Sequence, residues 1–453
     1  MKSKSSATLI PSNHPFLVRP NTTIFYLSVP ILLSLLTEPV TGLVDTIFIK
    51  KLGADSLAAL GVGTVALSGL FWIFNFLGIS SQTEIGQAEG NNDRLRSVSM
   101  STLALTMSLV FGLIITVVGI PLTPYLSKLL GASGDVYYGT IDYMTWRWIG
   151  APAILITLTA SGVLRGLQDM RSPLWIALGI NCINIILDPI LIFGLGPIPP
   201  LGITGAAIAS VIAYWAGAVW AVWIVKTKLG WSFKFNFNAI GRLMRIGSDL
   251  FFRTGALNIF IILTTREATL GGPDMGAAHQ AIRQVWMLTT FVLDSFAIAG
   301  QSLVAYFMGA NLIKPARKVA RVVCLWSAVS GCLLALILGL TSEIIVNYLV
   351  PKTAKIFFNS AWIFVLIIQP VNAIAFATDG LHWGSGDYRY LRNSVILSST
   401  LGTVMLLIGP QTLTWIWITT GIWTNFRATL GILRIWPGIG NSPFRKKLQK
   451  KSS

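Results

Sequence analysis

The stretch TGLVDTIFI, Thr41–Ile49, places the carboxylate of Asp45 inside an apolar run that begins near Ile24. A second carboxylate, Asp188, lies in another apolar run, Asn184–Phe193. An ionisable side chain is costly at membrane depth, so such a residue usually serves a function there. Apolar surroundings also favour the neutral form of a carboxyl group, which brings proton uptake and release into the cellular range. The two acids therefore predict a transporter whose cargo movement is coupled to ions.

The composition is that of a membrane protein with many spans. The chain has 453 residues, of which 53% are hydrophobic and 11% charged, and its mean hydropathy is +0.69. A soluble chain carries about 25% charged residues, and one span needs about 20 apolar residues. We therefore expect an all-α integral membrane protein with about twelve transmembrane helices. They are expected to start near residues 24, 57, 99, 141, 174, 203, 247, 281, 322, 356, 393 and 411.

The net charge of +17 is a signal of topology rather than of nucleic-acid binding. Of the 34 Lys and Arg residues, 24 fall in the loops on one side of the predicted spans, 6 in the loops on the other, and 4 within or beside spans. The positive-inside rule then places both termini on the cytoplasmic side of a plasma or inner membrane. Anionic membrane lipid is the expected partner of the basic side, and no nucleic acid is expected.

The second half of the sequence repeats the first. Gly53–Leu60 aligns with Gly272–His279 at an offset of 219, and further matches follow at 218. These are Pro152 with Pro370, Gly162 with Gly380, Gly166 with Gly384, and Asp169 with Asp387. Two six-helix lobes of the same orientation follow, related by a pseudo-twofold axis along the membrane normal. The expected parts are an N-terminal lobe with the cation site (1–225), a cytoplasmic linker (226–245), a C-terminal lobe (246–435) and a basic cytoplasmic tail (436–453).

The predicted cation site belongs to the first lobe alone, because the repeat aligns Asp45 with Thr264 and Asp188 with Leu406. Both acids are expected near one depth, and Asn184 lies one helical turn before Asp188. Ser210 offers a further oxygen ligand. Such a site can hold a proton or Na⁺, the latter on Asp45, Asp188 and Asn184. As an alternative, Asp188 caps a break at Pro189 while Asp45 lies at the membrane interface near Lys50 and Lys51.

Other residues are weaker candidates. Glu38 lies two turns before Asp45 on about the same helical face and could line the same cavity. Pro30 is expected to bend the first helix. Further candidates for lining a cavity are Trp72, Phe76, Asp294 and Arg253. For the last two, the alternative is an ion pair with each other inside the second lobe.

The sequence shows no signature of an enzyme. It contains no G-x-x-x-x-G-K-[ST] phosphate loop, and its three histidines are too scattered to suggest a zinc site. We therefore expect no cofactor beyond a coupling ion. A membrane-embedded enzyme would need clustered His, Cys or acidic groups in both lobes, and the sequence has none.

Several segments in order resemble the multidrug and toxic compound extrusion (MATE) family, especially its branch named after the DNA-damage-inducible protein F. They are Gly42–Thr46, Leu52–Gly53, Leu57–Leu60, Gly162–Asp169 with Pro173, Asn184–Gly194, Gly205–Ala209 and Leu293–Ala297.

The resemblance implies a twelve-helix, two-lobed antiporter that exports small organic compounds, often cationic, against H⁺ or Na⁺. We expect it to be a monomer. It implies that Asp45, Asp188 and Asn184 form the cation site and that Pro30 bends the first helix. Ser210 stands where a Thr is frequent, and Ser161 where many members have Asn. Two alternatives are a flippase for lipid-linked saccharides, of the same superfamily, and an exporter of organic acids.

Overall fold

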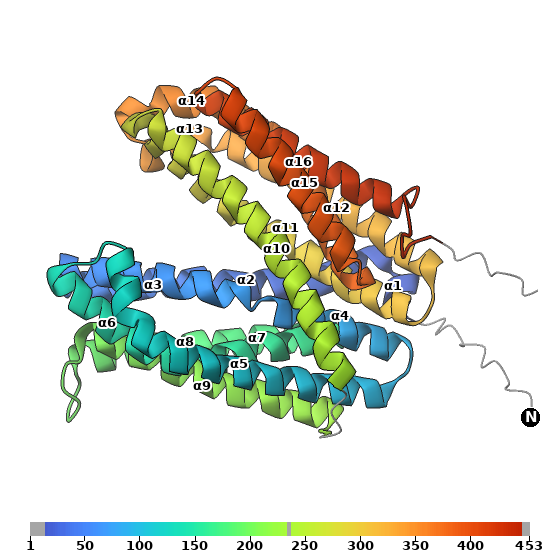
Figure 1. The fold of residues 1–453 in the computed structure, drawn as a ribbon, viewed down its shortest axis with the longest axis horizontal. Helices are drawn as coiled ribbons and strands as arrows, with labels where there is room; N and C mark the ends of the chain where they lie inside the picture. The colour runs from blue at the N-terminus through green and yellow to red at the C-terminus, as the bar shows by residue number, and fades with distance from the viewer. Residues whose placement is uncertain (1–13, 233–236, 446–453) are drawn as a thin grey trace, which may run out of the picture. The chain divides into compact units, whose positions relative to one another are not determined.

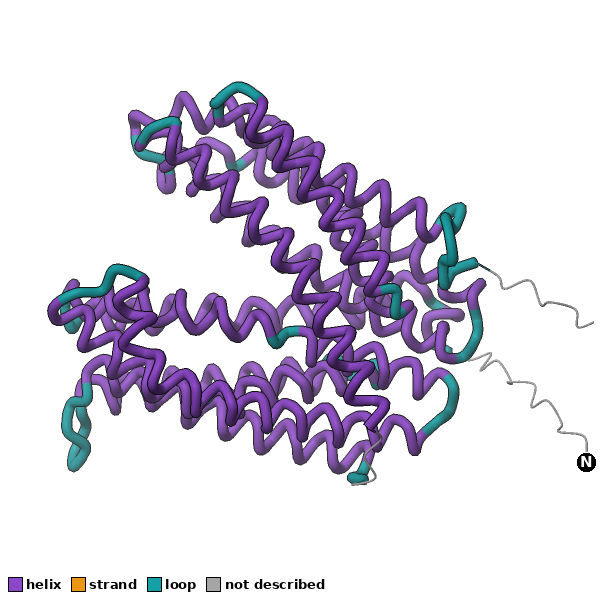
Figure 2. Tube along the Cα trace, viewed as in Figure 1, coloured by secondary structure: helices purple, strands orange, loops and turns teal. Residues whose placement is uncertain are grey.

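The computed structural model describes residues 14–232 and 237–445, and this part of the chain is almost entirely helical (Figure 2). It contains no β-strand within those residues, only an isolated bridge between Leu195 and Ile198. Ten helices are long and apolar enough to cross a membrane. The number is eleven when α6 (Gly134–Ile149) and α7 (Ala151–Gly166), which meet at a bend of 49°, count as one span. The last long helix, Leu413–Ile435, completes a set of about twelve, as predicted.

The chain divides into two compact units, which we call the N-unit (30–89 and 93–247) and the C-unit (14–29, 90–92 and 248–445). Two long helices, α2 (Pro20–Lys50) and α10 (Phe237–Leu270), contribute residues to both. Their residues change unit after Val29 and after Gly247, which are nearly equivalent positions of the repeat because 29 + 219 = 248. Residues 14–29 therefore group with the C-unit, although the sequence analysis assigned them to the first lobe.

The N-unit contains the larger part of α2 and the first turns of α10 (Figure 1). Its remaining helices follow in chain order. They are α3 (Ala54–Ile73), α4 (Phe76–Gly90), α5 (Arg94–Leu129), α6 (Gly134–Ile149), α7 (Ala151–Gly166), α8 (Arg171–Phe193) and α9 (Gly202–Leu229).

The C-unit contains the start of α2 and most of α10, together with the second set of helices (Figure 1). Its core gathers large apolar side chains, among them Trp286, Phe358 and Trp417. The helices are α1 (Pro15–Val18), α11 (Pro273–Gly309), α12 (Ile313–Leu340), α13 (Ser342–Leu349), a 3-10 turn (Lys352–Ala354), α14 (Lys355–Ser385), α15 (Tyr388–Ile408) and α16 (Leu413–Ile435).

The internal repeat reappears in the turns between helices. Of the turn residues with positive φ in the first half, three are matched by an equivalent residue in the second half. The pairs are Gly53 (118°) with Gly272 (111°), Asn92 (54°) with Asn311 (59°), and Gln168 (61°) with Gly386 (76°). Positive φ is unfavourable for most L residues, so its recurrence at offsets of 218 and 219 shows that the two halves turn in the same way.

The repeat also reappears in the closest helix contacts. A Cβ added at Gly162 would lie 2.2 Å from the Gly78 carbonyl oxygen, and one at Gly380 would lie 2.2 Å from the Ala297 carbonyl oxygen. Two further pairs of glycines are equivalent in the same way. A Cβ added at Gly112 would meet Pro152, and one at Gly331 would meet Pro370; a Cβ added at Gly166 would meet Gln82, and one at Gly384 would meet Gln301. Small residues let helix backbones approach closely in membrane proteins. Each unit therefore uses equivalent glycines at these close helix contacts.

Helix occupies much of the segment expected to be a linker. Within 226–245, α9 continues to Leu229 and α10 begins at Phe237, while residues 233–236 lie outside the described chain. At the nearby turn, Lys228 forms an ion pair with Asp169 at 2.7 Å. Burial opposes ionisation of this carboxyl, but the hydrogen bonds from Lys228 and Ser172 outweigh it and lower the pKa of Asp169.

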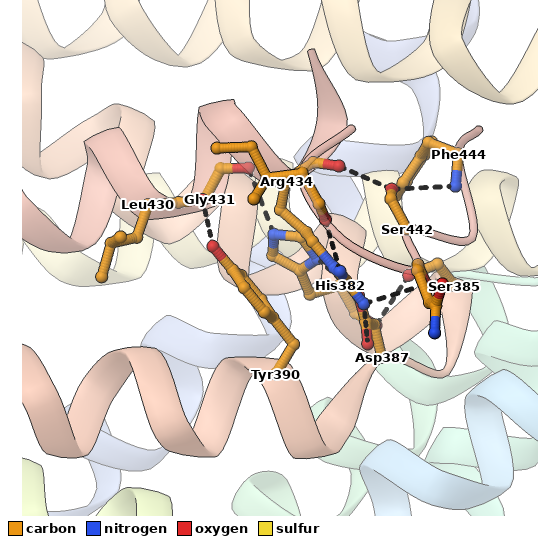
Figure 3. Close-up of polar contacts among 11 residues, drawn as sticks. His382, Ser385, Asp387, Tyr390, Leu430, Gly431, Arg434, Ser442 and Phe444 are labelled. Atoms are coloured by element: carbon orange, nitrogen blue, oxygen red, sulfur yellow. Dashed lines mark hydrogen bonds and ion pairs between the residues drawn. The ribbon is translucent and has the colours of Figure 1, made fainter. Parts of the chain in front are cut away.

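The beginning of the predicted tail is folded against the end of α16 (Figure 3). Arg434 binds Asp387 with Nε to Oδ2 at 2.7 Å, and its Nη1 donates to the Ile439 carbonyl oxygen at 2.5 Å. The Ser442 hydroxyl donates to the Arg434 carbonyl oxygen at 2.6 Å, and Phe444 is fully buried. Residues 436–445 therefore belong to the C-unit, and 446–453 lie outside the described residues.

Candidate cation site

The acids predicted from the sequence meet inside the N-unit. Asp45 lies on α2 and Asp188 on α8, with their carboxyl groups close enough for a hydrogen bond when one carries a proton. Asp188 is fully buried and Asp45 half-buried. Asp45 Oδ1 and Asp188 Oδ2 have no hydrogen-bond partner among the described residues. Two carboxylate oxygens cannot satisfy each other, because both only accept; a proton on one of them, or a cation between them, would supply the missing partner.

The amide of Asn184 completes the acid pair. This side chain is 2% exposed, and its Nδ2 donates to Asp188 Oδ1 at 3.3 Å and to the Ser210 hydroxyl at 3.4 Å. Its Oδ1 is buried and, within the described chain, has no donor. Asp45, Asp188 and Asn184 therefore present three buried acceptor oxygens without donors, a hard-ligand set suited to H⁺ or Na⁺. We call these three residues with Ser210 the cation site.

A contact one turn away fixes α2 against α8. The Thr41 hydroxyl donates a hydrogen bond to the Asn181 side-chain oxygen. Thr41 precedes Asp45 by four residues, and Asn181 precedes Asn184 by three, so both lie near the site residues on their helices. This interhelical bond positions the first acid relative to the second. The sequence analysis did not identify it.

The structure adds a basic residue, Arg147, that the sequence analysis only placed at the edge of a span. It lies on α6, and its charge reaches Asp45, Asp188 and Glu38. Its guanidinium lies over the Tyr214 ring, 5.6 Å from the centroid. A basic residue within an apolar helix is as costly at membrane depth as an acid. The same reasoning that singled out Asp45 could therefore have identified Arg147 from the sequence.

The remaining candidates of the first lobe differ in their surroundings. Glu38 is exposed and lies within charge–charge range of Arg147 and Tyr214. Pro30 is inside α2, at the first residue that belongs to the N-unit. Ser161 is half-buried on α7, and the hydrogen bonds of the cation site do not include it. Phe76 is a core residue, 7% exposed, with its ring against Gly247, whereas the Trp72 side chain lies outside the described structure.

The C-unit buries a different charged cluster. Arg253 and Arg427 both donate to Asp379 Oδ2, the latter at 2.8 Å. The side chains of Arg427 and Asp379 are 3% and 6% exposed. Asp294 lies within charge–charge range of Arg427. The sequence analysis offered an Asp294–Arg253 pair, but the structure pairs Arg253 with Asp379, an acid in an apolar run that it had overlooked.

The two clusters differ because the repeat diverged in chemistry. Asp379 is equivalent to Ser161, since 379 − 218 = 161, and Arg253 is equivalent to Ser34. In the C-unit, the carboxylate of Asp379 already has guanidinium donors. In the N-unit, the three oxygens lack donors among the described residues. The carboxylates of the N-unit therefore lack the donors that the Asp379 carboxylate has. Groups of three or more His, Cys, Asp or Glu suited to a metal ion do not occur in the described ranges.

The helical repeat with a buried oxygen site defines a multi-pass membrane transporter. A family profile described as MatE matches residues 30–190 and 257–408, more than half of the chain. The chain belongs to this family of multidrug and toxic compound extrusion transporters, as its sequence predicted, and the homologues it matches there are transporters rather than enzymes.

Relatives and solved structures agree with this assignment. Protein DETOXIFICATION 44, chloroplastic, of Arabidopsis thaliana is 29% identical over 421 residues, which cover 89% of this chain and 78% of that protein. DNA damage-inducible protein F of Escherichia coli (strain K12) is 26% identical over 441 residues, with 93% of each chain covered. A crystal structure of MATE in the bent conformation matches with a TM-score of 0.84 at 20% identity, covering 91% of this chain and 94% of that one. The last match supports the fold.

Proposed function

We propose that this protein is a secondary antiporter that exports small organic compounds, often cationic, in exchange for H⁺ or Na⁺ bound at the cation site. The observation that supports this most is the set of three buried oxygens on Asp45, Asp188 and Asn184 without donors in the described chain. The relatives' names, which refer to detoxification, support export of foreign compounds.

Cation binding would drive the cycle through charge. Two ionised carboxylates close together repel each other, and a proton or Na⁺ removes that repulsion. Since Asp45 lies on α2 and Asp188 on α8, cation binding draws these helices together and cation release loosens them. Pro30 lacks the backbone N–H of a regular helical bond, so α2 can bend there at low cost.

The available gradients are large enough for this exchange. Each pH unit supplies about 1.36 kcal/mol per proton, and each positive charge moved inward adds about 2.3 kcal/mol per 100 mV. A concentration ratio of ten requires about 1.4 kcal/mol. One cation per cargo molecule therefore drives useful export. We further propose that the protein functions as a monomer. We also propose that it lies in a cell membrane with both termini cytoplasmic, which the distribution of Lys and Arg supports.

Transport by purified protein in lipid vesicles tests the proposal. Efflux of a fluorescent organic cation is measured under an imposed pH gradient, an imposed Na⁺ gradient, and no gradient. The Asp45→Asn, Asp188→Asn double variant should lose gradient-driven transport, at least tenfold, because both ionisable ligands are removed. Asp55→Asn, at an exposed acid of the same unit, serves as the matched control. Undiminished gradient-driven efflux by the double variant would refute the proposal.

A further inference from the structure

Arg147 lies among the acids of the N-unit but its guanidinium is incompletely paired. Its Nε and Nη1 atoms are buried and, within the described chain, have no hydrogen-bond partner. Burying a guanidinium without acceptors is unfavourable unless nearby charge compensates. That compensation comes from the acids around it, so the side chain is held by charge rather than by one fixed hydrogen bond.

The titratable groups near Arg147 come from four helices. The acids are Glu38 and Asp45 on α2 and Asp188 on α8, and the neutral phenols are Tyr143 on α6 and Tyr214 on α9. The last position is one turn beyond Ser210, just as Arg147 is one turn beyond Tyr143 and Asp188 is one turn beyond Asn184. Because Arg147 lies within charge–charge range of both Asp45 and Asp188, it lies near the cation site.

Two acids of α2 compete for this guanidinium. Glu38 and Asp45 are seven residues apart, which is two helical turns or about 10 Å along the axis. Both attract Arg147, but only Asp45 also belongs to the cation site. When a proton or Na⁺ neutralises Asp45, the attraction from that side disappears and the attraction from Glu38 remains.

We propose that Arg147 is an internal counter-cation that is attracted mainly to Asp45 while the cation site is unoccupied and mainly to Glu38 once a cation is bound. This inference rests on the proposed function. It gives Arg147 a positioning role: its movement along α2 converts neutralisation of the acids into a change in how α2 packs on α6. Arg147 also competes with the coupling ion for Asp45, so it sets the cation concentration at which the site fills.

Vesicle transport at varied concentrations of the coupling cation tests this role. Arg147→Gln should lower the cation concentration for half-maximal transport about tenfold, because a positive neighbour that disfavours cation binding is gone. Glu38→Gln should raise that concentration, because Arg147 then pairs with Asp45 alone. Arg147→Lys should stay near the unsubstituted protein, since it keeps the charge. Arg321→Gln, at an exposed arginine of α12, is the matched control and should change nothing.

A double variant separates this partner exchange from a merely structural role. Once Arg147→Gln is present, adding Glu38→Gln should have almost no further effect, because the partner that links the two acids is missing. The inference would be overturned if the cation concentration for half-maximal transport changed in the same direction in the Arg147→Gln and Glu38→Gln proteins, or did not change in either. If Arg147→Gln does not fold, Glu38→Gln alone decides it, because a cation concentration for half-maximal transport that does not rise in that variant would overturn the inference. Failure of the proposed function is recognised separately, by full gradient-driven transport in the Asp45→Asn, Asp188→Asn protein.

Discussion

The side chains of Asp45, Asp188 and Asn184 lie on α2 and α8, and their spare acceptor oxygens define the chemistry of the N-unit. Asp45 and Asp188 could be predicted as site residues from the sequence, because a carboxylate in an apolar run is exceptional. Asn184 could be predicted because it lies one helical turn from Asp188. Asp379 and Arg427 carry the same exceptional signal in later helices. Their pairing could not be read from the sequence, because it depends on how α14 and α16 pack.

The buried cluster of the C-unit gives a prediction at the scale of single residues. Asp379→Asn leaves the guanidinium groups of Arg253 and Arg427 without their shared carboxylate. Removing one partner of a buried ion pair costs about 3–5 kcal/mol. We expect a lower free energy of unfolding by about that amount, measured by thermal unfolding of the detergent-solubilised protein.

The matched control for this change is Asp135→Asn, at an exposed acid in the first turn of α6. It should alter stability by less than about 1 kcal/mol. An Asp379→Asn protein that unfolds at the same temperature as the Asp135→Asn protein would show that the arginines find other acceptors.

Helix positions were predictable from apolar runs, and helix breaks were less so. The expected start near residue 57 falls within α3, but α3 and α4 are separated by a turn at residues 74–75 that hydropathy does not reveal. Likewise α6 and α7 meet at Gly150 with a bend of 49°. The residues on both sides of a helix break are apolar because both sides lie within the membrane, so composition alone cannot locate the break.

Close glycine packing gives a prediction at the scale of helices. Gly380→Ala adds a Cβ that would lie only 2.2 Å from the Ala297 carbonyl oxygen, so α14 must move away from α11. Overpacking of this kind costs about 1–3 kcal/mol, which should appear as a lower unfolding temperature. Gly255→Ala on α10 is the matched control, because nothing lies within 4 Å of its added Cβ.

The control should be neutral or stabilising, since alanine favours helix over glycine by about 1 kcal/mol. Equal unfolding temperatures for the Gly380→Ala and Gly255→Ala proteins would mean that this helix contact is looser than the structure indicates.

Duplication explains the organisation of the whole molecule, and the sequence revealed it through matches at offsets of 218 and 219. Equivalent turns and equivalent glycine contacts follow the same offsets in the structure. The division of α2 and α10 between the units could not be foreseen, because each is one continuous helix across its boundary. The folding of residues 436–445 onto the C-unit was likewise hidden, because it depends on contacts of Arg434 with backbone carbonyls.

Cation release on cargo binding is the most direct test of the central claim, that the buried acids exchange a cation for cargo. Titrating an organic cation into purified protein, in buffers of different ionisation enthalpy and at varied Na⁺, measures the protons or Na⁺ ions released per cargo molecule bound. The account predicts release of about one cation per cargo molecule from the unsubstituted protein and none from the Asp45→Asn, Asp188→Asn protein. Saturable cargo binding to the unsubstituted protein without any cation release would contradict it.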